Sequence, residues 1–343
     1  MEAGCDMVWS YADVGIDLGT ENVRVVVRGR GVVIDEPSAV AVDRQSGLFA
    51  AAGGQAEELL ATDPYKFIRL RPLSNGAIAR YDCALMLLRN IITRVSGGRG
   101  LARPRVALSV AARPSQVEKR TWLQVAMESG ARATALVEAP MAAAIGAGVD
   151  VLAPGGNMVA DIGAGVTDIG VVSAGGIVVS DRLKVGGASI DRGLQAYARD
   201  SHRLALGRRS AEEIKVKLGA QGWTTQEASL TVHGRDLADG LPKAATFSAK
   251  EMSPAIERQV QPVIDAVRCL FGCTPPELAS DIAATAIVLT GGGSRLAGLA
   301  GLMSEKMGVL FRVAPDPDTC VIRGIGELLT GMDPRVTCAW KSV

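Results

Sequence analysis

Two turns in this sequence combine a carboxylate with glycine in the way that phosphate sites require. The first turn is D-L-G-T-E-N at residues 17–22, and the second is D-I-G-A-G at residues 161–165. Glycine lets backbone N–H groups approach an anion with no side chain in the way. A carboxylate at each strand end, Asp17 and Asp161, could hold Mg²⁺, largely through waters. Side-chain donors come from Thr20, Asn22 and Thr167. The pair of turns therefore suits a triphosphate and its Mg²⁺.

Two further segments carry groups that could hold the rest of a nucleotide. G-G-G-S at 291–294 follows an apolar strand and is expected to open a helix, a good place for a phosphate or ribose. A-E-E-I-K-V-K-L-G at 211–219 puts Glu212 and Lys215 on one helix face, where they could hold ribose hydroxyls and flank the base. Each piece alone has an ordinary explanation: a hairpin, a capped loop or a solvated helix face. Four pieces in one order, two of them repeats, predict nucleotide binding.

The turns belong to longer stretches that repeat one pattern. Residues 14–27 and 158–172 each show a β-rich run, an Asp-x-Gly turn and a second β-rich run, which is typical of a strand hairpin. Each hairpin continues into further strand and then helix patterns. Two copies of one unit predict an α/β protein with two similar halves facing each other.

The remaining pattern alternates strands and helices. Strands are expected at 105–112, 135–138 and 285–290, and helices at 115–130, from Pro140 to about Gly148, and from Ser294 to Met307. Ser115 with Glu118 three residues later forms the capping box that opens the first of these helices, and Pro140 suits a first helical turn. A polar stretch at about 220–245 predicts a small inserted subdomain.

Composition limits the class of protein. The 343 residues are 48% hydrophobic and 21% charged with a net charge of +1, which is typical of a globular chain with a real core and gives no sign of nucleic-acid binding. The longest apolar runs are too short to predict a transmembrane helix. No signal peptide is evident, so a reducing cytoplasm is expected. The six cysteines are scattered, and buried or partly buried thiols are expected rather than a metal or redox pair at Cys269 and Cys273.

Taken together, these stretches resemble the MreB and Mbl family of bacterial actins, within the superfamily of actin, heat-shock chaperone ATPases and sugar kinases. The matching stretches run from about residue 14 to residue 330: D-L-G-T-E-N-V, R-G-R-G-V-V-I-D-E-P-S, R-P-L-S-N-G-A-I-A, A-P-M-A-A-A-I-G-A-G, N-M-V-A-D-I-G-A-G-V-T-D, C-T-P-P-E-L-A-S-D-I and L-T-G-G-G-S-R-L-A-G-L. The P-M-A-A-A-I-G-A-G and P-P-E-L-A-S-D-I runs are specific to the shape-determining branch.

The resemblance implies an actin-like two-domain fold, with duplicated α/β units around a cleft that holds ATP and Mg²⁺. Domain I would span 12–143 plus 315–335, with a small subdomain at about 30–70. Domain II would span 144–314, with an inserted subdomain at about 208–250. Carried onto this sequence, Asp17 and Asp161 are the Mg²⁺-side carboxylates. The nucleotide-binding residues so implied are Gly19, Thr20, Glu21, Asn22, Gly163, Ala164, Gly165, Glu212, Glu213, Lys215, Gly291, Gly292, Gly293 and Ser294.

The same resemblance implies cell-shape filaments on the cytoplasmic face of the inner membrane. Partners would be further copies of the chain or an active paralogue, together with membrane proteins of the wall-synthesis and shape machinery, and no nucleic acid. Family filaments attach through an amphipathic N-terminus or a hydrophobic loop. Here the first dozen residues carry Met7, Val8, Trp9 and Tyr11 but no Lys or Arg, and the loop at 96–104 offers one leucine. A weak anchor and an ordinary surface loop both remain open.

One departure from the family pattern bears on catalysis. The family motif reads Glu-Glu-Pro-Met-Ala-Ala-Ala, and the Glu before Pro positions the water that attacks the γ-phosphate. Here V-E-A-P at 137–140 puts Ala139 at that position. General-base help of this kind is worth roughly 10² to 10⁴ in rate, so slow or absent hydrolysis is expected. Glu138 is a poor substitute because its side chain points elsewhere, and Thr167 is left as a candidate contact to water or phosphate.

Other departures touch the phosphate turns. Glu21 replaces a small residue, and its carboxylate would repel an anion unless it points outward or meets the metal. Ala164 replaces a glycine, and Ala188 stands where an acidic residue is usual. Two alternatives to an active filament protein therefore stay open. One is a pseudo-ATPase scaffold that binds filament or wall-synthesis partners without polymerising. The other, which the filament-branch motifs disfavour, is a small-molecule kinase of the same superfamily.

Overall fold

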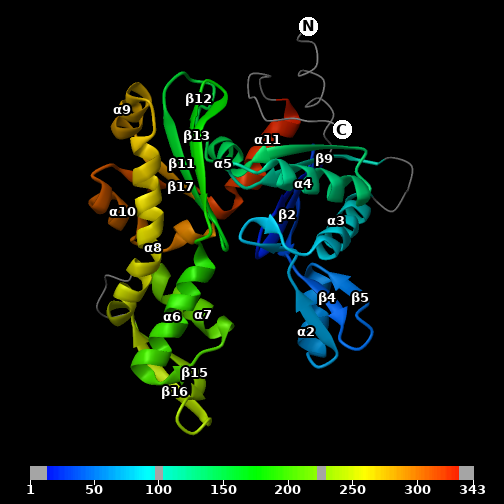
Figure 1. Ribbon diagram of the computed structural model, residues 1–343, viewed down its shortest axis with the longest axis vertical. Coiled ribbons are helices and arrows are strands. Elements are labelled where there is room, and N and C mark those ends of the chain that lie inside the picture. The colour runs from blue at the N-terminus through cyan, green and yellow to red at the C-terminus, as the bar shows by residue number, and fades with distance from the viewer. Residues whose placement is uncertain (1–13, 97–102, 222–228, 332–343) are drawn as a thin grey trace.

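A computed structural model describes residues 14–96, 103–221 and 229–331 as two α/β halves side by side, each with a smaller lobe below it (Figure 1). The first half contains a five-stranded sheet in the order β10-β9-β1-β2-β3. Its strands are β1 (Val14–Leu18), β2 (Asn22–Val27), β3 (Gly31–Pro37), β9 (Arg105–Val110) and β10 (Ala133–Glu138). Strands β1, β2 and β3 pair antiparallel, whereas β9 and β10 run parallel to β1.

The second half repeats this topology strand for strand. Its sheet has the order β13-β12-β11-β17-β18, with β11 to β13 antiparallel and β17 and β18 parallel to β11. The strands are β11 (Asn157–Ile162), β12 (Thr167–Ser173), β13 (Gly176–Leu183), β17 (Ile287–Thr290) and β18 (Phe311–Val313). The prediction of duplicated α/β units, made from the repeated Asp-x-Gly hairpins, is confirmed.

Helices cover both sheets and connect them. The outer helices are α3 (Tyr81–Val95), α4 (Gln116–Glu128), α6 (Gly187–His202), α7 (Arg208–Gln221), α8 (Ala249–Gly272), α9 (Pro276–Ala284) and α10 (Leu299–Met307). Between the sheets, α5 (Ala139–Gly146) packs against α11 (Cys320–Thr330), in the middle of Figure 1. All eight residues of α5 are buried, because it is built from alanine, glycine and a few larger apolar residues. This helix pair joins the two halves behind the cleft.

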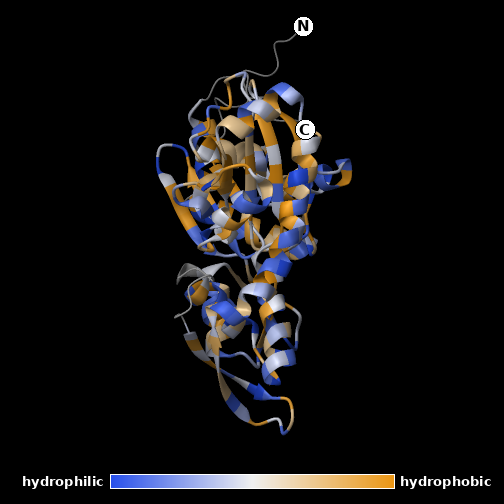
Figure 2. Cartoon of the chain, turned by 90° about the vertical axis from the view of Figure 1, so that its left-hand side faces the viewer, coloured by the Kyte–Doolittle hydropathy of each residue, from blue (hydrophilic) through white to orange (hydrophobic). Residues whose placement is uncertain are grey.

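Each half carries a small sheet at its lower end. In the first half these strands are β4 (Val40–Asp43), β5 (Phe49–Ala52) and β6 (Phe67–Leu70), which pack with α2 (Gly54–Thr62), and a short hairpin follows from β7 (Leu73–Ser74) and β8 (Ala77–Ile78). In the second half they are β14 (Leu204–Ala205), β15 (Ser229–Asp236) and β16 (Pro242–Ser248). Hydrophobic residues concentrate on the strands of the upper part, whereas the lower lobe mixes both kinds (Figure 2). The domain boundaries given above stay a prediction.

Most of the predicted elements are present, and one helix start is wrong. Ser115 opens α4 with a full capping box, since its hydroxyl accepts the N–H of Glu118 and the Glu118 carboxylate accepts the N–H of Ser115. Ser294, in contrast, does not open a long helix. Residues Gly292–Arg295 form a separate 3-10 turn, η1, and α10 begins only after Gly298, whose φ of +87° breaks the helical path.

The prediction about the cysteines has an outcome, whereas the candidate membrane anchors fall outside the described residues. Cys83 and Cys320 are buried as expected, but the expectation is wrong for Cys269 and Cys273, which are exposed on α8 and just after it. The proposed anchor residues 7–11 and the glycine-rich loop residues 97–102 lie outside the described part of the chain, as do Cys5 and Cys338. Among the described residues, no helix is long and apolar enough to cross a membrane.

Candidate functional site

The two Asp-x-Gly turns have the same geometry and face each other. In the first turn the N–H of Gly19 donates to the carbonyl of Asn22 at 2.9 Å, and in the second the N–H of Gly163 donates to the carbonyl of Val166 at 2.9 Å. The turns approach closely, because a Cβ built on Gly165 would lie 2.7 Å from the Thr20 hydroxyl. A side chain at Gly165 would thus collide with Thr20 where the two halves meet, and residues of both turns line one cavity.

A buried carboxylate precedes each turn and is held by a hydroxyl from the neighbouring parallel strand. Ser109 at the end of β9 donates to Asp17 at 2.6 Å, and Thr290 at the end of β17 donates to Asp161 at 2.8 Å. Burial raises the pKa of Asp17, and it raises the pKa of Asp161 to about 7, with the charge of Asp17 adding to that rise. Two buried, mutually repelling carboxylates make a strong site for a cation.

Two adjoining cavities form the cleft between the halves. One of about 260 Å³ contains the carboxylates and turns, and one of about 460 Å³ extends over α6 and α7. The first cavity is lined by the predicted residues Asp17, Gly19, Thr20, Glu21, Asn22, Ala139, Asp161, Gly163, Ala164, Gly165, Gly291 and Gly292. The second adds Glu212, Lys215 and Gly293. The structure therefore brings most of the predicted site together from five separate segments.

Three predicted residues do not reach the cleft. Glu213 is exposed and pairs with Lys217 at 2.6 Å, because adjacent helical residues point about 100° apart and Glu212 occupies the cleft side. Ser294 is buried, and its hydroxyl donates to the carbonyl of Gly291 at 2.7 Å within its own turn. Thr167 is fully buried and donates to the carbonyl of Val185 at 2.8 Å.

On the α7 side of the cleft, one ion pair fixes the predicted lysine. The ammonium of Lys215 lies 2.8 Å from the carboxylate of Asp191 on α6, and it also reaches the carbonyl of Gly187 at 3.4 Å. Both partners are largely buried, with side-chain exposures of 17% and 6%. Lys215 is therefore held in place, while Glu212 lines the same cavity as an exposed acceptor.

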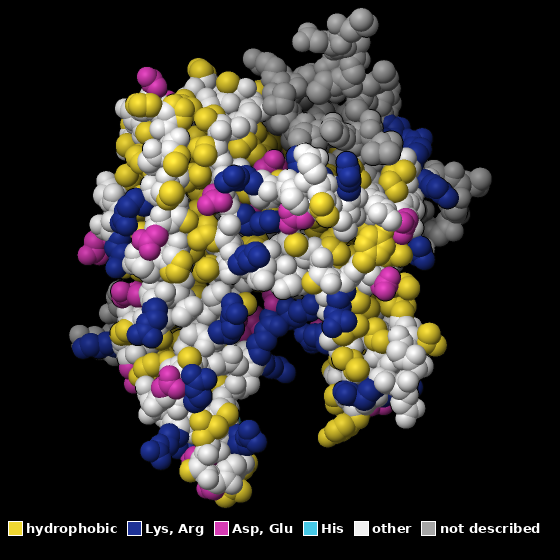
Figure 3. Space-filling model, viewed as in Figure 1, with side chains coloured by type: hydrophobic (Ala, Val, Ile, Leu, Met, Phe, Trp, Pro, Cys, Tyr) yellow, Lys and Arg dark blue, Asp and Glu magenta, His cyan; other side chains and the backbone are white. Residues whose placement is uncertain are grey.

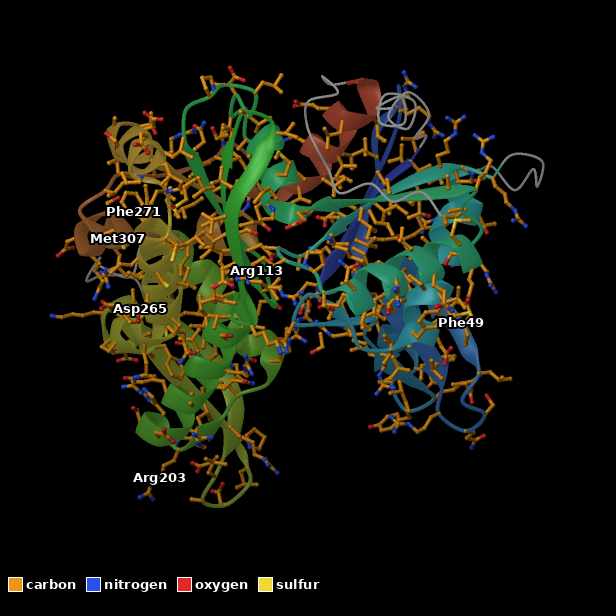
Figure 4. All side chains as sticks on the ribbon, turned by 45° about the horizontal axis from the view of Figure 1, so that its top comes forward. Phe49, Arg113, Arg203, Asp265, Phe271 and Met307 are labelled. Carbon is orange, nitrogen blue, oxygen red and sulfur yellow. The ribbon has the colours of Figure 1, made fainter. Side chains whose placement is uncertain are left out.

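The position that the family resemblance assigns to the water-positioning glutamate has no carboxylate here. Ala139 is buried and lines the cleft, and its methyl group can neither orient a water molecule nor accept a proton. The neighbouring Glu138 does not line that cavity, and its carboxylate accepts the N–H of Arg113 at 3.0 Å. Figure 4 places Arg113 between the two halves, where its guanidinium lies 3.6 Å from Asp181. Glu138 thus binds the backbone of Arg113, at the contact between the halves, and does not face the cleft.

Glu21 finds a role other than repulsion. Its carboxylate forms ion pairs with Arg71, which follows β6, and with Arg208, which opens α7 on the other half. Burial would raise the pKa of Glu21, but hydrogen bonds and charge from these arginines outweigh it and hold the pKa below its usual value. The expected repulsion of an anion by Glu21 is therefore largely offset by two guanidinium groups.

Ala164 fits its turn without strain. It is not among the residues with positive φ, so a Cβ costs nothing in backbone conformation at this position. Its carbonyl accepts the N–H of Ala188 at 2.8 Å, and the carbonyl of Gly163 accepts the N–H of Gly187 at 3.0 Å. The start of α6 is thus fixed against the second turn.

Strand register adds two residues that the motif analysis missed. Arg24 lies opposite Asp17 in the β1–β2 hairpin, and Asp168 lies opposite Asp161 in the β11–β12 hairpin. Both line the central cavity. The guanidinium of Arg24 pairs with Asp318 and lowers the pKa of both buried carboxylates, against the larger effect of burial. The sequence contained a signal for both residues, because Arg24 and Asp168 each lie seven residues after the aspartate of their turn.

Asp168 is the second buried acid of its half. Burial raises its pKa to about 7, although the N–H of Ala112 donates to it at 2.7 Å and the charge of Asp161 adds to the rise. Ala112 follows β9 in the other half, so this hydrogen bond crosses the cleft. A second crossing bond joins Arg182 to Glu118 at 2.9 Å. The halves are thus tied on the side of the cleft near Ala139.

The donor set fits a hydrated Mg²⁺ better than a metal enclosed by protein. Among the described residues, no group of three or more His, Cys, Asp or Glu side chains is placed to hold a metal. Asp17 and Asp161 each place a buried carboxylate before a turn, whereas the carboxylate of Glu21 is paired with Arg71 and Arg208. Mg²⁺ commonly uses one or two carboxylates with substrate phosphates and waters. The residues present therefore fit a metal that arrives with a phosphate ligand.

Comparisons with known proteins agree with this geometry. The profile of the family described as MreB/Mbl protein matches residues 11–336. The chain is 37% identical to the cell shape-determining protein Mbl of Bacillus subtilis, covering 94% of this chain and 96% of that one. It is 38% identical to MreB of Escherichia coli K12, covering 94% of each. The crystal structure of MreB5 of Spiroplasma citri bound to ADP superposes with a TM-score of 0.85 at 31% identity, covering 92% of this chain and 95% of that one. The structure of the same protein bound to AMPPNP also superposes with a TM-score of 0.85, at 32% identity, covering 91% of this chain and 94% of that one.

Proposed function

We propose, because this chain belongs to the MreB/Mbl family, that it is an ATP-binding, actin-like cell-shape protein that assembles into filaments and hydrolyses ATP slowly. The observation that carries the proposal is the pair of glycine turns that face each other across one cleft, each following a buried aspartate. The relatives named above are cell shape-determining proteins, and the MreB5 structures hold ADP or an ATP analogue in the same fold.

In this proposal the two turns bind the phosphates and the α7 side binds the nucleoside. Backbone N–H groups of residues 19–22 and 163–165 would surround the phosphate oxygens, with the Thr20 hydroxyl as a further donor. Lys215 and Glu212 would contact the ribose and flank the base, beside the backbone of residues 291–293. Asp17 and Asp161 would hold Mg²⁺, which supplies neutralising charge on the phosphates.

The residues around the γ-phosphate position favour retention of ATP over its hydrolysis. Ala139 leaves the attacking water without a carboxylate to orient it, and Glu138 is engaged by the N–H of Arg113. Asp168 lines the cavity but already accepts the N–H of Ala112, and burial favours its neutral form, which is a poor base. We expect hydrolysis to be slower by roughly 10² to 10⁴ than with a positioned general base.

The remaining parts of the proposal depend on family membership. We propose that domain I spans 12–143 plus 315–335 and domain II spans 144–314. We further propose that the filaments lie at the cytoplasmic face of the cell membrane and act with wall-synthesis membrane proteins. A non-polymerising scaffold that holds nucleotide is the second candidate, and the absence of a carboxylate at the cleft position of Ala139 is the observation that favours it.

Sedimentation separates these candidates. The purified protein would be centrifuged with Mg-AMPPNP, with Mg-ADP and without nucleotide, and the pellets inspected by electron microscopy. Nucleotide binding would be measured on the same samples by calorimetry. Pelleted filaments with AMPPNP support the proposal. Tight AMPPNP binding without a pellet, even at high protein concentration, favours the scaffold, and absence of both would overturn the nucleotide site.

A further inference from the structure

A second, strongly basic cavity opens beside the phosphate turns. It has a volume of about 600 Å³ and is lined by five arginines from both halves. These are Arg69, Arg71, Arg80, Arg192 and Arg208. Figure 3 shows Lys and Arg side chains gathered in the notch between the two lower lobes, where the cleft opens. We call this feature the arginine cavity.

The arginine cavity has more positive charge than its own carboxylates neutralise. Its two acidic residues are Glu21, which bridges Arg71 and Arg208, and Asp191, which is already bonded to Lys215 at 2.8 Å. Arg69 pairs with Glu57, which lies outside the cavity. Arg192 donates to the Ser189 hydroxyl at 3.0 Å and to a backbone carbonyl, both neutral acceptors. Within the described residues, Arg80 and Arg192 form no ion pair with a carboxylate. Like charges around one cavity repel, so an anion that enters is attracted by all of them.

The arrangement suits phosphate groups in particular. A guanidinium binds a phosphate through two parallel N–H···O bonds, and several arginines around one cavity can bind several phosphates at once. The volume lies within the range of small-ligand sites. The cavity shares Thr20, Glu21, Leu73 and Gly165 with the phosphate side of the cleft but does not include Asp17 or Asp161.

We propose that the arginine cavity binds a small oligophosphate anion next to the nucleotide. This inference rests on the proposed function only for the presence of a nucleotide beside it. Free polyphosphate and the phosphate chain of a second nucleotide share the required chemistry. Because Arg71 and Arg80 belong to one half and Arg192 and Arg208 to the other, the bound anion contacts both halves and holds them together across the cleft.

The test is a calorimetric titration of inorganic tripolyphosphate into protein saturated with Mg-AMPPNP, at about 150 mM salt. We expect one further equivalent to bind. The double variant Arg80→Gln with Arg192→Gln should weaken this binding on the order of tenfold or more, since a hydrogen bond to a charged group contributes that much. The matched control, Arg199→Gln with Arg268→Gln, removes two exposed arginines that lie outside the cavity and should bind as the wild type does.

Each outcome decides the point. Binding of a second equivalent of AMPPNP, sensitive to the same variants, supports the proposal with a nucleotide as the source of phosphate. Loss of AMPPNP on addition of tripolyphosphate, equal binding by wild type and double variant, or tighter binding of hexaglutamate would each overturn it. If AMPPNP itself does not bind, the proposed function fails, but tripolyphosphate titrated into the nucleotide-free wild type and double variant still tests whether the arginine cavity binds an oligophosphate. Neither Arg80 nor Arg192 lines the nucleotide cavities.

Discussion

Asp161 lies directly opposite Asp168 across the β11–β12 hairpin, and both carboxyl groups are buried. In the other half, Arg24 occupies the equivalent position opposite Asp17. The two hairpins therefore have the same strand pairing but different charges. Like charges directly opposite each other destabilise a sheet. Repulsion between these two carboxylates therefore destabilises the second hairpin when both are ionised, and a bound cation would reduce that repulsion.

This pair predicts a pH-dependent stability in the nucleotide-free protein without metal. Burial raises the pKa of Asp161 and of Asp168 to about 7, so both groups bind protons in the folded state at pH values where the unfolded chain has released them. The free energy of unfolding should then fall as pH rises from about 5 to 8. Asp168→Asn removes one of these groups and keeps an acceptor for Ala112, so the fall should shrink by about 2 kcal/mol.

Urea unfolding at pH 5, 6, 7 and 8 in EDTA measures this difference. Asp265→Asn is the control, because Asp265 is exposed on α8 and pairs with Arg268 far from the cleft (Figure 4). It should leave the pH dependence unchanged. An identical pH dependence in wild type and Asp168→Asn would show that the buried pair does not titrate in this range.

The crossing of α5 and α11 gives a second prediction. A Cβ on Gly324 would overlap the carbonyl of Ala142, and a Cβ on Gly146 would overlap the carbonyl of Cys320, so the two backbones touch at these glycines. Gly324→Ala should lower the free energy of unfolding by about 2 to 3 kcal/mol, because overpacking against backbone outweighs the better helix propensity of alanine.

The chain offers a helical glycine with open space as the matched control. Gly301 lies in α10, and a Cβ added there would have no other atom within 4 Å. Gly301→Ala should raise the free energy of unfolding by roughly 0.5 to 1 kcal/mol through propensity alone. Denaturant unfolding of the three proteins measures both effects. Equal stability of the two variants would mean that α5 and α11 do not need this close approach.

The bridge between Glu21 and Arg208 predicts a coupling in nucleotide affinity. Arg208→Gln should weaken AMPPNP binding several-fold, because the charge of Glu21 then stands beside the Thr20 turn with one partner fewer. Glu21→Gln in the same protein should recover most of that loss. The coupling energy should be about 0.5 to 1 kcal/mol, since both side chains are partly exposed, and it should shrink at high salt.

A double-mutant cycle of the four proteins, titrated with AMPPNP at two ionic strengths, measures the coupling. The pair of single variants also separates two causes. If Arg208 contacts the phosphates directly and does not act through Glu21, the two substitutions will be additive and the double variant will bind as weakly as the sum predicts. That result would rule out the neutralising role given to the bridge.

The sequence predicted the duplicated sheet because the Asp-x-Gly hairpins occur twice with the same flanking pattern. The predictions were wrong for residues whose place in the cleft depends on the direction of the side chain and not only on the spacing along the chain. Glu213 follows Glu212 on a helix, and Thr167 precedes Asp168 on a strand, so each neighbour points away from the cleft. The ion pairs of Glu21 also could not be predicted from the sequence, because Arg71 and Arg208 come from opposite halves and meet only in the folded protein.

The central claim, ATP-dependent assembly with a disabled hydrolytic step, is tested most directly by one paired measurement. Wild type and Ala139→Glu would be sedimented with Mg-ATP on anionic liposomes while phosphate release is recorded in the same samples. We predict that the wild type pellets and releases little phosphate, and that Ala139→Glu pellets and releases it at least tenfold faster, because a carboxylate then lines the cavity beside the phosphate turns. A wild type that releases phosphate as fast as the variant, or that stays in the supernatant with ATP bound, would contradict the account.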